Sequence, residues 1–254
     1  MTSDNLFIGL NRIHLSETDS TNNYARTLVR DKMPIEGTVV TADKQTNGRG
    51  QRSNSWVTEP RSNLTCSYIL RPAFLAAKDQ FTLSASAALA VFDLISDEVV
   101  DHSVKIKWPN DILVGEKKIA GILIENSLRG MNLDYSIVGI GLNVNQTVFP
   151  DGINGTSLKL ILNRSFEIDD VLSRLNSKLE KRYLQLRQRQ HQTILSQFNQ
   201  NLFAFEEERM LKLNGAENQF IIRGVRPSGE LQLQHQDGTN SLHQHHEIEW
   251  NLKP

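Results

Sequence analysis

The chain of 254 residues has little cysteine, little net charge and no long apolar run, and each shortage excludes a class of protein. Its one cysteine, Cys66, excludes an internal disulfide and a multi-cysteine metal site, and it fits a reducing cytoplasm. A formal net charge of −1 gives no support to nucleic-acid binding. No apolar run approaches the roughly 18 residues of a membrane span, and residues 1–7 lack the basic start and apolar core of a signal peptide. We therefore expect a cytoplasmic protein that binds neither membranes nor nucleic acids.

What is present is the composition of a globular protein. Hydrophobic residues make up 39% and charged residues 22% of the chain, which is enough for an ordinary core. The length allows one large domain or a large and a small one. Near Glu206 the composition changes to short strands divided by turn residues, the pattern of a small β-barrel or sandwich. We expect residues 1–205 to form the larger domain and residues 206–254 a small domain that docks on it.

Apolar periodicity predicts the individual elements. A helix from about Asp79 to Val100 has apolar residues at spacings of three and four, which core packing explains. Helices are also expected after Ser20, a residue that could cap the first of them, and over 169–203 with a break. Strands are predicted over 38–42, 63–70, 104–108, 112–114, 117–125 and 137–144, and then over 210–213, 220–225, 229–234 and 247–250.

The segment 47–56 is the strongest candidate for a functional loop. It is rich in Gly, Asn and Ser around Gly48-Arg49-Gly50, so neither a helix nor a packed strand is expected. Glycine lets the backbone pass close to a ligand, successive N–H groups can form an anion-binding concavity, and Arg49 adds a planar fork suited to carboxylate or phosphate. The pattern predicts a loop that closes over an anionic small molecule, with a solvated surface loop as the alternative.

A second candidate is the Lys-Trp-Pro-Asn-Asp segment at 107–111. Its proline ends the strand, which leaves Asn110 and Asp111 in a turn where polar side chains can reach a pocket. Lys117 and Lys118 follow at the mouth of an apolar strand, where a lysine either extends to water or neutralises a bound anion. Both faces of that strand are apolar, so these residues alone do not decide which lysine points inward.

Three histidines near the C-terminus, His243, His245 and His246, invite a metal-binding interpretation. Alternate positions on a strand could ligate zinc, but no carboxylate or cysteine with convincing spacing accompanies them. We expect a solvated strand or loop there and no metal site, and we expect Cys66 to be a core residue of a strand.

Taken in order, these segments resemble the biotin–protein ligases. The resemblance covers roughly Ser20 to Asn145 and rests on the Ser-Thr-Asn at 20–22, the glycine loop ending in tryptophan, the 107–111 segment, the Lys-Ile-Ala-Gly-Ile-Leu at 118–123 and the Gly-Ile-Gly-Leu-Asn at 139–143. It implies an α+β fold: a mixed-sheet catalytic domain of the biotin/lipoate ligase type, followed by a small SH3-like β-barrel.

The resemblance also implies an ATP-dependent ligase. The biotin carboxylate would attack the α-phosphate of ATP, accompanied by Mg²⁺, and give biotinyl-5′-adenylate and pyrophosphate. A lysine of a biotin carboxyl carrier domain of a biotin-dependent carboxylase would then attack the mixed anhydride and form an amide. Such chemistry needs fixed positive charge between two anions and shielding from water. Whether the enzyme is a monomer or a homodimer is left open.

Residue roles follow from the resemblance, position by position. Biotin would be bound by Ser20, Thr21, Asn22, Gln45, Gly48, Arg49, Gly50, Gln51, Lys118 and Gly121. ATP would be bound by Arg52, Trp56, Asn110 and Asn143. The catalytic roles would fall to Lys118, Arg49, Asp111 and Lys107. The resemblance therefore selects Lys118 over its neighbour as the lysine that contacts carboxylate and phosphate.

Two departures from the family pattern are expected to matter. Gln51 stands where the family often has arginine, and Asn54 stands where it has arginine or another residue. Because glutamine has no charge, we expect Gln51→Arg to slow escape of the adenylate. Residues 1–15 are too short for the DNA-binding domain of repressor members, so DNA binding is not expected. Two alternatives remain: a lipoate–protein ligase, which shares the fold and chemistry, and a non-catalytic biotin or nucleotide sensor, against which Lys118 argues.

Overall fold

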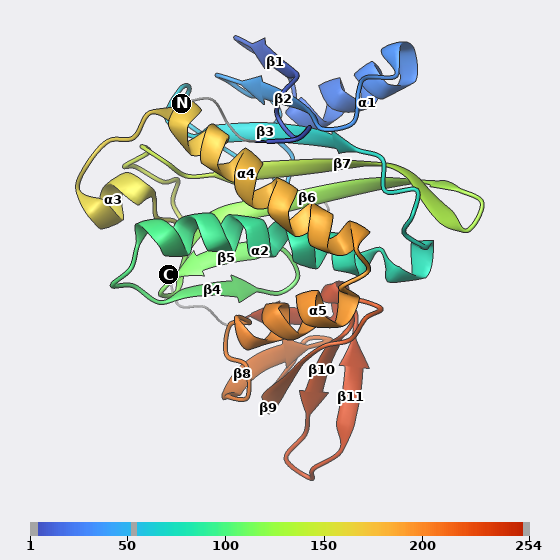
Figure 1. The fold of residues 1–254 in the computed structure, drawn as a ribbon. Helices are drawn as coiled ribbons and strands as arrows, with labels where there is room; N and C mark the ends of the chain where they lie inside the picture. The colour runs from blue at the N-terminus through green and yellow to red at the C-terminus, as the bar shows by residue number, and fades with distance from the viewer. Residues whose placement is uncertain (1–4, 52–54, 251–254) are drawn as a thin grey trace.

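The computed structural model describes residues 5–51 and 55–250, and a seven-stranded sheet forms its main body (Figure 1). In spatial order the strands are β1 (Arg12–Leu15), β2 (Thr38–Ala42), β3 (Leu64–Leu70), β7 (Asn132–Leu142), β6 (Lys117–Arg129), β5 (Asp111–Val114) and β4 (Val104–Lys107). Strand β1 runs parallel to β2, and the other neighbouring pairs of this sheet are antiparallel. The sheet is therefore mixed, as the fold prediction requires.

Helices cover both faces of this sheet. On one face α1 (Thr21–Lys32) packs against a small cluster that includes Val40, Ile69 and Ile137. On the other face α2 (Phe81–Glu98) and α4 (Ile168–Arg187) cover a larger core, to which the neighbouring residues Val39 and Tyr68 belong (Figure 1). Successive strand residues point to opposite faces, so one strand supplies both cores. This explains why every residue of β2 and β3 is buried, whichever face it points to.

A second, five-stranded antiparallel sheet follows α5 (His191–Gln200). Its order is β11 (Asn240–His243), β10 (Leu231–Gln234), β9 (Ala216–Val225), β8 (Glu208–Leu213) and β12 (Ile248–Trp250). This sheet agrees with the predicted SH3-like unit. Trp108 Nε1, just after β4, donates to Gly229 O in the turn before β10 at 3.0 Å and so links the two sheets. The backbone N–H of Ile106 in β4 donates to Asn201 O, at the end of α5, at 2.9 Å. A domain division at residue 205 remains a prediction.

Most predicted elements are present, with bounds that shift by a few residues. The sequence analysis missed β1, α3 (Leu158–Leu162) and β11, which are short or polar and carry little periodicity. The break expected within 169–203 separates α4 from α5, where Arg189 adopts a φ of 60°. Ser20 occupies the N-cap of α1, but its hydroxyl makes no capping bond. Instead Gln45 Oε1 accepts from the backbone N–H of Thr21 at 2.8 Å.

The expectation for the C-terminal histidines was wrong for His243, which is buried in β11. Its ring is accommodated by polar partners, because Nε2 lies 2.6 Å from Ser241 Oγ and Nδ1 lies 3.4 Å from the Glu247 carboxylate. Within residues 5–51 and 55–250, no group of three or more His, Cys, Asp or Glu is placed to hold a metal ion. Over the same ranges, no helix is long and apolar enough to cross a membrane.

Cys66 is a buried residue of β3, as predicted. Burial away from water raises the pKa of its thiol to about 12. The side chain is therefore a protonated, packed group at neutral pH.

Candidate functional site

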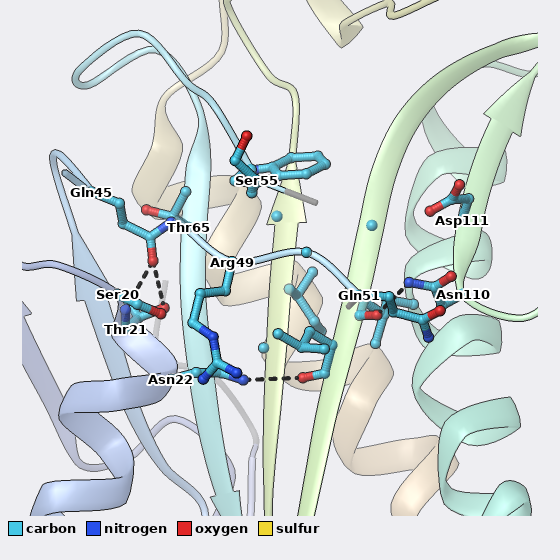
Figure 2. Close-up of a pocket in the computed structure, with 18 of the residues that line it drawn as sticks. Ser20, Thr21, Asn22, Gln45, Arg49, Gln51, Ser55, Thr65, Asn110 and Asp111 are labelled. Atoms are coloured by element: carbon cyan, nitrogen blue, oxygen red, sulfur yellow. Dashed lines mark hydrogen bonds between the residues drawn. The ribbon is translucent and has the colours of Figure 1, made fainter. Parts of the chain in front are cut away.

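A cavity of about 180 Å³ lies between the glycine loop, the start of α1 and the central strands. In Figure 2, Ser20, Thr21, Asn22 and Gln45 lie on one side, Asn110 and Asp111 on the other, and Arg49 and Gln51 between them. The cavity brings together most of the predicted site residues: Ser20, Thr21, Asn22, Gln45, Arg49, Gly50, Gln51, Trp56, Lys107, Asn110, Asp111, Lys118 and Gly121. These residues are far apart in the sequence and come from both halves of the main sheet.

Two described residues to which the sequence analysis assigned a binding role, Gly48 and Asn143, do not line the cavity. Gly48 is buried at the base of the loop, where its carbonyl accepts from Trp56 N at 2.8 Å. Asn143 is buried behind the wall, and its amide donates to Thr156 O at 3.0 Å. Arg52 and Asn54 lie outside the described residues. The roles given to these residues stay predictions.

Glycines on β6 and β7 make room for the cavity. A Cβ at Gly141 would lie 2.3 Å from the Trp56 indole, and one at Gly139 would lie 2.2 Å from Asn22 Oδ1. Gly121 pairs directly with Gly141 across the two strands, and its Cβ would lie 3.1 Å from the same indole. These strand glycines thus permit the close approach of Trp56 and Asn22 to the sheet.

Positive charge is concentrated at the side of Asp111. Lys118 Nζ lies 2.6 Å from Asp111 Oδ1, and Lys107 Nζ lies 3.3 Å from Oδ2. Lys118 Nζ also lies 5.5 Å from the centroid of the Trp56 ring. Two cations share one carboxylate, so this side of the cavity has positive charge left for an anionic ligand.

A register shift explains why Lys118 faces the cavity. In the β5–β6 pairing, Ile112 is opposite Ala120 but the next residue, Leu113, is opposite Lys118. Such a bulge re-aims the side chains that follow it. Lys117 is exposed and does not line the cavity. The question that the residues alone left open is therefore answered by geometry in favour of Lys118.

The glycine loop is fastened across the cavity by Arg49. Its Nη1 donates to Asn23 Oδ1 of α1 at 3.0 Å and to Glu125 Oε1 of β6 at 3.1 Å. The Asn23 amide in turn donates to Asp19, and this bond holds the pKa of that carboxyl below its usual value. The arginine predicted to bind an anion is thus paired with protein groups, and a bound anion would compete with them.

Two polar atoms of the loop are buried without a hydrogen-bond partner among the described residues: Trp56 Nε1 and Gln51 Oε1. An unsatisfied buried polar group costs roughly 1–3 kcal/mol, so native proteins rarely retain one without a reason. Both residues line the cavity. A ligand that offers an acceptor to the indole and a donor to the amide would remove this cost.

Two residues near the site were not singled out by the sequence analysis. Ser67 and Glu125 lie behind the cavity wall and hydrogen-bond to Asn22. A polar serine inside the apolar 63–70 strand was a signal that could have been used. His245, which the sequence analysis expected in a solvated strand or loop, lies in the 3-10 turn before β12 and lines the cavity. No local pattern predicts this, because its position depends on how the two sheets pack.

Comparison with known proteins agrees with this geometry. The sequence profile of the Biotin/lipoate A/B protein ligase family matches residues 15–143. The Bifunctional ligase/repressor BirA of Bacillus subtilis is 38% identical over 69% of this chain and 54% of its own length. The Biotin--[acetyl-CoA-carboxylase] ligase of Mycobacterium tuberculosis is 31% identical over 68% of this chain and 64% of its own length. The chain spans little more than half the length of the first of these relatives.

The fold is shared along almost the whole chain with a solved structure. The biotin protein ligase of Aquifex aeolicus, in complex with biotin and ATP, superposes with a TM-score of 0.78 at 25% identity. The match covers 94% of this chain and 98% of that one, so it includes both sheets.

Proposed function

The chain belongs to the Biotin/lipoate A/B protein ligase family, and on that basis we propose that it is a biotin–protein ligase, which activates biotin with ATP and transfers it to a protein lysine. The observation that carries the choice of biotin is the polar side of the cavity. Four uncharged polar side chains gather there: Ser20, Thr21, Asn22 and Gln45. A cyclic urea offers two N–H donors and a carbonyl acceptor to such a group of side chains.

Lipoate fits the same side poorly. Its dithiolane ring has no N–H and no carbonyl, so it would leave the polar side chains desolvated and unpaired, and a site built to hydrogen-bond its ligand strongly rejects an analogue without those groups. Gln45 has its Oε1 turned to Thr21, which leaves its amide N–H groups for a ligand carbonyl. The hydroxyl of Ser20 makes no capping bond to α1 and lines the same space.

The charged side suits the first chemical step. A carboxylate and the α-phosphate of ATP repel each other, and Lys118, Lys107 and Arg49 supply the positive charge that brings them together. A carboxylate oxygen bonds to phosphorus while pyrophosphate leaves, and Mg²⁺ enters with ATP as part of the substrate. We expect Trp56 and Asn110 to contact the nucleotide, because both line the cavity close to these cations. The loop above them shields the mixed anhydride from hydrolysis.

In the second step an uncharged lysine amine attacks the acyl carbon, an amide bond forms and AMP leaves. We propose that this lysine belongs to a biotin carboxyl carrier domain in the cytoplasm, that neither membrane nor nucleic acid takes part, and that residues 1–205 are the catalytic domain with 206–254 as its small β-domain. A non-catalytic sensor would need only the cations that bind its ligand. Here two lysines, Lys107 and Lys118, converge on Asp111 at the side of the cavity where the carboxylate and the α-phosphate would react.

The test is incubation with biotin, Mg-ATP and a biotin carboxyl carrier domain, with mass spectrometry of the carrier. We expect one added biotinyl group on one lysine, no product without ATP, and no product with lipoate in place of biotin. Lipoyl transfer would favour the lipoate ligase alternative. Biotin binding without ATP–pyrophosphate exchange would favour a sensor, and either result would overturn the proposal.

A further inference from the structure

A buried chain of hydrogen bonds runs behind the polar side of the cavity. Ser67, which is fully buried on β3, has its Oγ 2.6 Å from Asn22 Oδ1 and 2.7 Å from Thr21 Oγ1. The Asn22 amide nitrogen lies 2.9 Å from Glu125 Oε2 and 3.3 Å from Leu123 O. Ser67 and Glu125 do not line the cavity themselves.

Glu125 and Leu123, at one end of this series of hydrogen bonds, determine which group donates and which accepts at each step. A carboxylate and a backbone carbonyl only accept, so the Asn22 side chain must turn its NH₂ to Glu125 and Leu123. Its oxygen then faces Ser67 and can only accept. The single hydroxyl proton of Ser67 is therefore committed to Asn22, and Ser67 can meet Thr21 only as an acceptor.

The consequence falls on Thr21. Its hydroxyl proton is directed to Ser67 at 2.7 Å, with Gln45 Oε1 at 3.2 Å as the longer alternative. Both partners are protein groups, so the proton does not point into the cavity. What Thr21 offers to a ligand is a lone pair, while the free N–H groups of Gln45 offer donors beside it.

We propose that Ser67 and Glu125 are positioning residues that set this polarity, and that the subsite they control selects a ligand head group with an N–H donor next to a carbonyl acceptor. The inference rests on the proposed function, and it deepens that function by assigning specificity to residues outside the cavity. Glu125 is suited to the role because Arg26 and Arg49 both pair with its other oxygen, which holds the carboxylate in place.

The test compares biotin with its two cyclic carbamate analogues, in each of which one ureido N–H is replaced by oxygen. Calorimetry gives the dissociation constants for the wild type and for Ser67→Ala. In the wild type, at least one analogue should bind about 10- to 100-fold more weakly than biotin, because its ring oxygen faces the lone pair of Thr21. In Ser67→Ala only the longer bond to Gln45 holds the Thr21 proton, so the hydroxyl can turn and donate to the ring oxygen. The ratio of the dissociation constant of this analogue to that of biotin should therefore fall at least about fivefold relative to the wild type.

Ser136→Ala is the matched control. Ser136 is a fully buried serine of the neighbouring strand β7, its hydroxyl donates to Asn126 at 2.7 Å, and it does not line the cavity. This variant should keep the wild-type ratio. General weakening of the sheet would lower the affinity for all three ligands together and leave the ratio unchanged. Glu125→Gln, which lets the Asn22 amide turn over, should lower the ratio as well and replaces Ser67→Ala if that variant does not fold.

The outcomes separate the two proposals. A wild-type protein that does not bind biotin refutes the proposed function and this inference with it. A wild type that binds biotin but shows no preference over either carbamate refutes the polarity alone. An equal ratio in wild type and Ser67→Ala refutes the role of Ser67 while leaving the ligase activity intact.

Discussion

Replacement of Lys118 by alanine is the most direct perturbation of the charged side of the cavity. Lys118 Nζ and Lys107 Nζ share the Asp111 carboxylate at 2.6 and 3.3 Å, so the variant leaves one lysine to balance that carboxylate and only Arg49, which is paired with Glu125, for the reacting anions. The Lys118 side chain is about one-third exposed, which places it in surroundings of intermediate polarity. A unit charge about 4 Å from a phosphate oxygen is then worth about 4 kcal/mol.

That energy corresponds to an adenylation step roughly a thousandfold slower, and loss of a single donor to a developing charge in other enzymes costs about 10²- to 10³-fold. The assay is biotin-dependent exchange of labelled pyrophosphate into ATP. Transfer from pre-formed biotinyl-adenylate to the carrier, measured separately, should fall less, because the charge between two anions is needed chiefly in the first step.

Lys117→Ala is the matched control, since the neighbouring lysine lies on the same strand but is exposed and outside the cavity. It should exchange pyrophosphate at the wild-type rate. An exchange rate within about threefold of wild type in Lys118→Ala would refute the assigned role. Equal losses in the two variants would show that damage to the strand, and not loss of the charge, is responsible.

Four further perturbations test other parts of the structure. Gln51→Arg should slow release of biotinyl-adenylate in the absence of acceptor, because a cation replaces an amide whose Oε1 is buried and unpaired; equal release rates would contradict this. Gly139→Ala should raise the KM for biotin and spare that for ATP, because its Cβ would lie 2.2 Å from Asn22 Oδ1; an unchanged KM for biotin would show that Asn22 is not needed. Cys66, with a pKa raised to about 12 by burial, should resist iodoacetamide near pH 9, where a free thiol of pKa about 8.5 is largely ionised; rapid labelling of the folded protein would disprove it. Glu180→Gln should lower the free energy of unfolding in urea by about 1–3 kcal/mol, because the Glu180 carboxylate accepts from the backbone N–H groups of residues 6–8. A decrease smaller than about 0.5 kcal/mol would show that these hydrogen bonds do not stabilise the N-terminal segment.

Local chemistry accounts for what the sequence analysis predicted well. Glycine and arginine in the 47–56 loop, and proline after a strand at 107–111, constrain the backbone wherever they occur, so both segments reach the cavity as expected. The strands over 38–42 and 63–70 were predicted almost to the residue because both faces are buried and every position is apolar or small.

What was missed depends on contacts between distant residues. Which of two adjacent lysines faces the cavity depends on a register shift between β5 and β6, and no pattern within either strand encodes it. The bond from Asn22 to Glu125 joins residues 103 positions apart. Periodicity reports which face of an element is buried, but it does not report which polar group on another strand will meet it.

The arrangement of the sheet also explains why a neutral head group and an anionic group can be held by one ligand site. The uncharged polar residues come from α1 and the segment after β2, on one side of the sheet order, whereas Lys107, Asp111 and Lys118 come from β4, β5 and β6 on the other. Strands β3 and β7 lie between them, and the glycines of β7 and β6, Gly139, Gly141 and Gly121, leave room for Trp56, Asn22 and the cavity beside them. A ligand that spans the cavity from the Ser20 side to the Lys118 side would place an uncharged hydrogen-bonding ring at one end and a carboxylate at the other. Biotin has this distribution of groups, and lipoate shares only the carboxylate end.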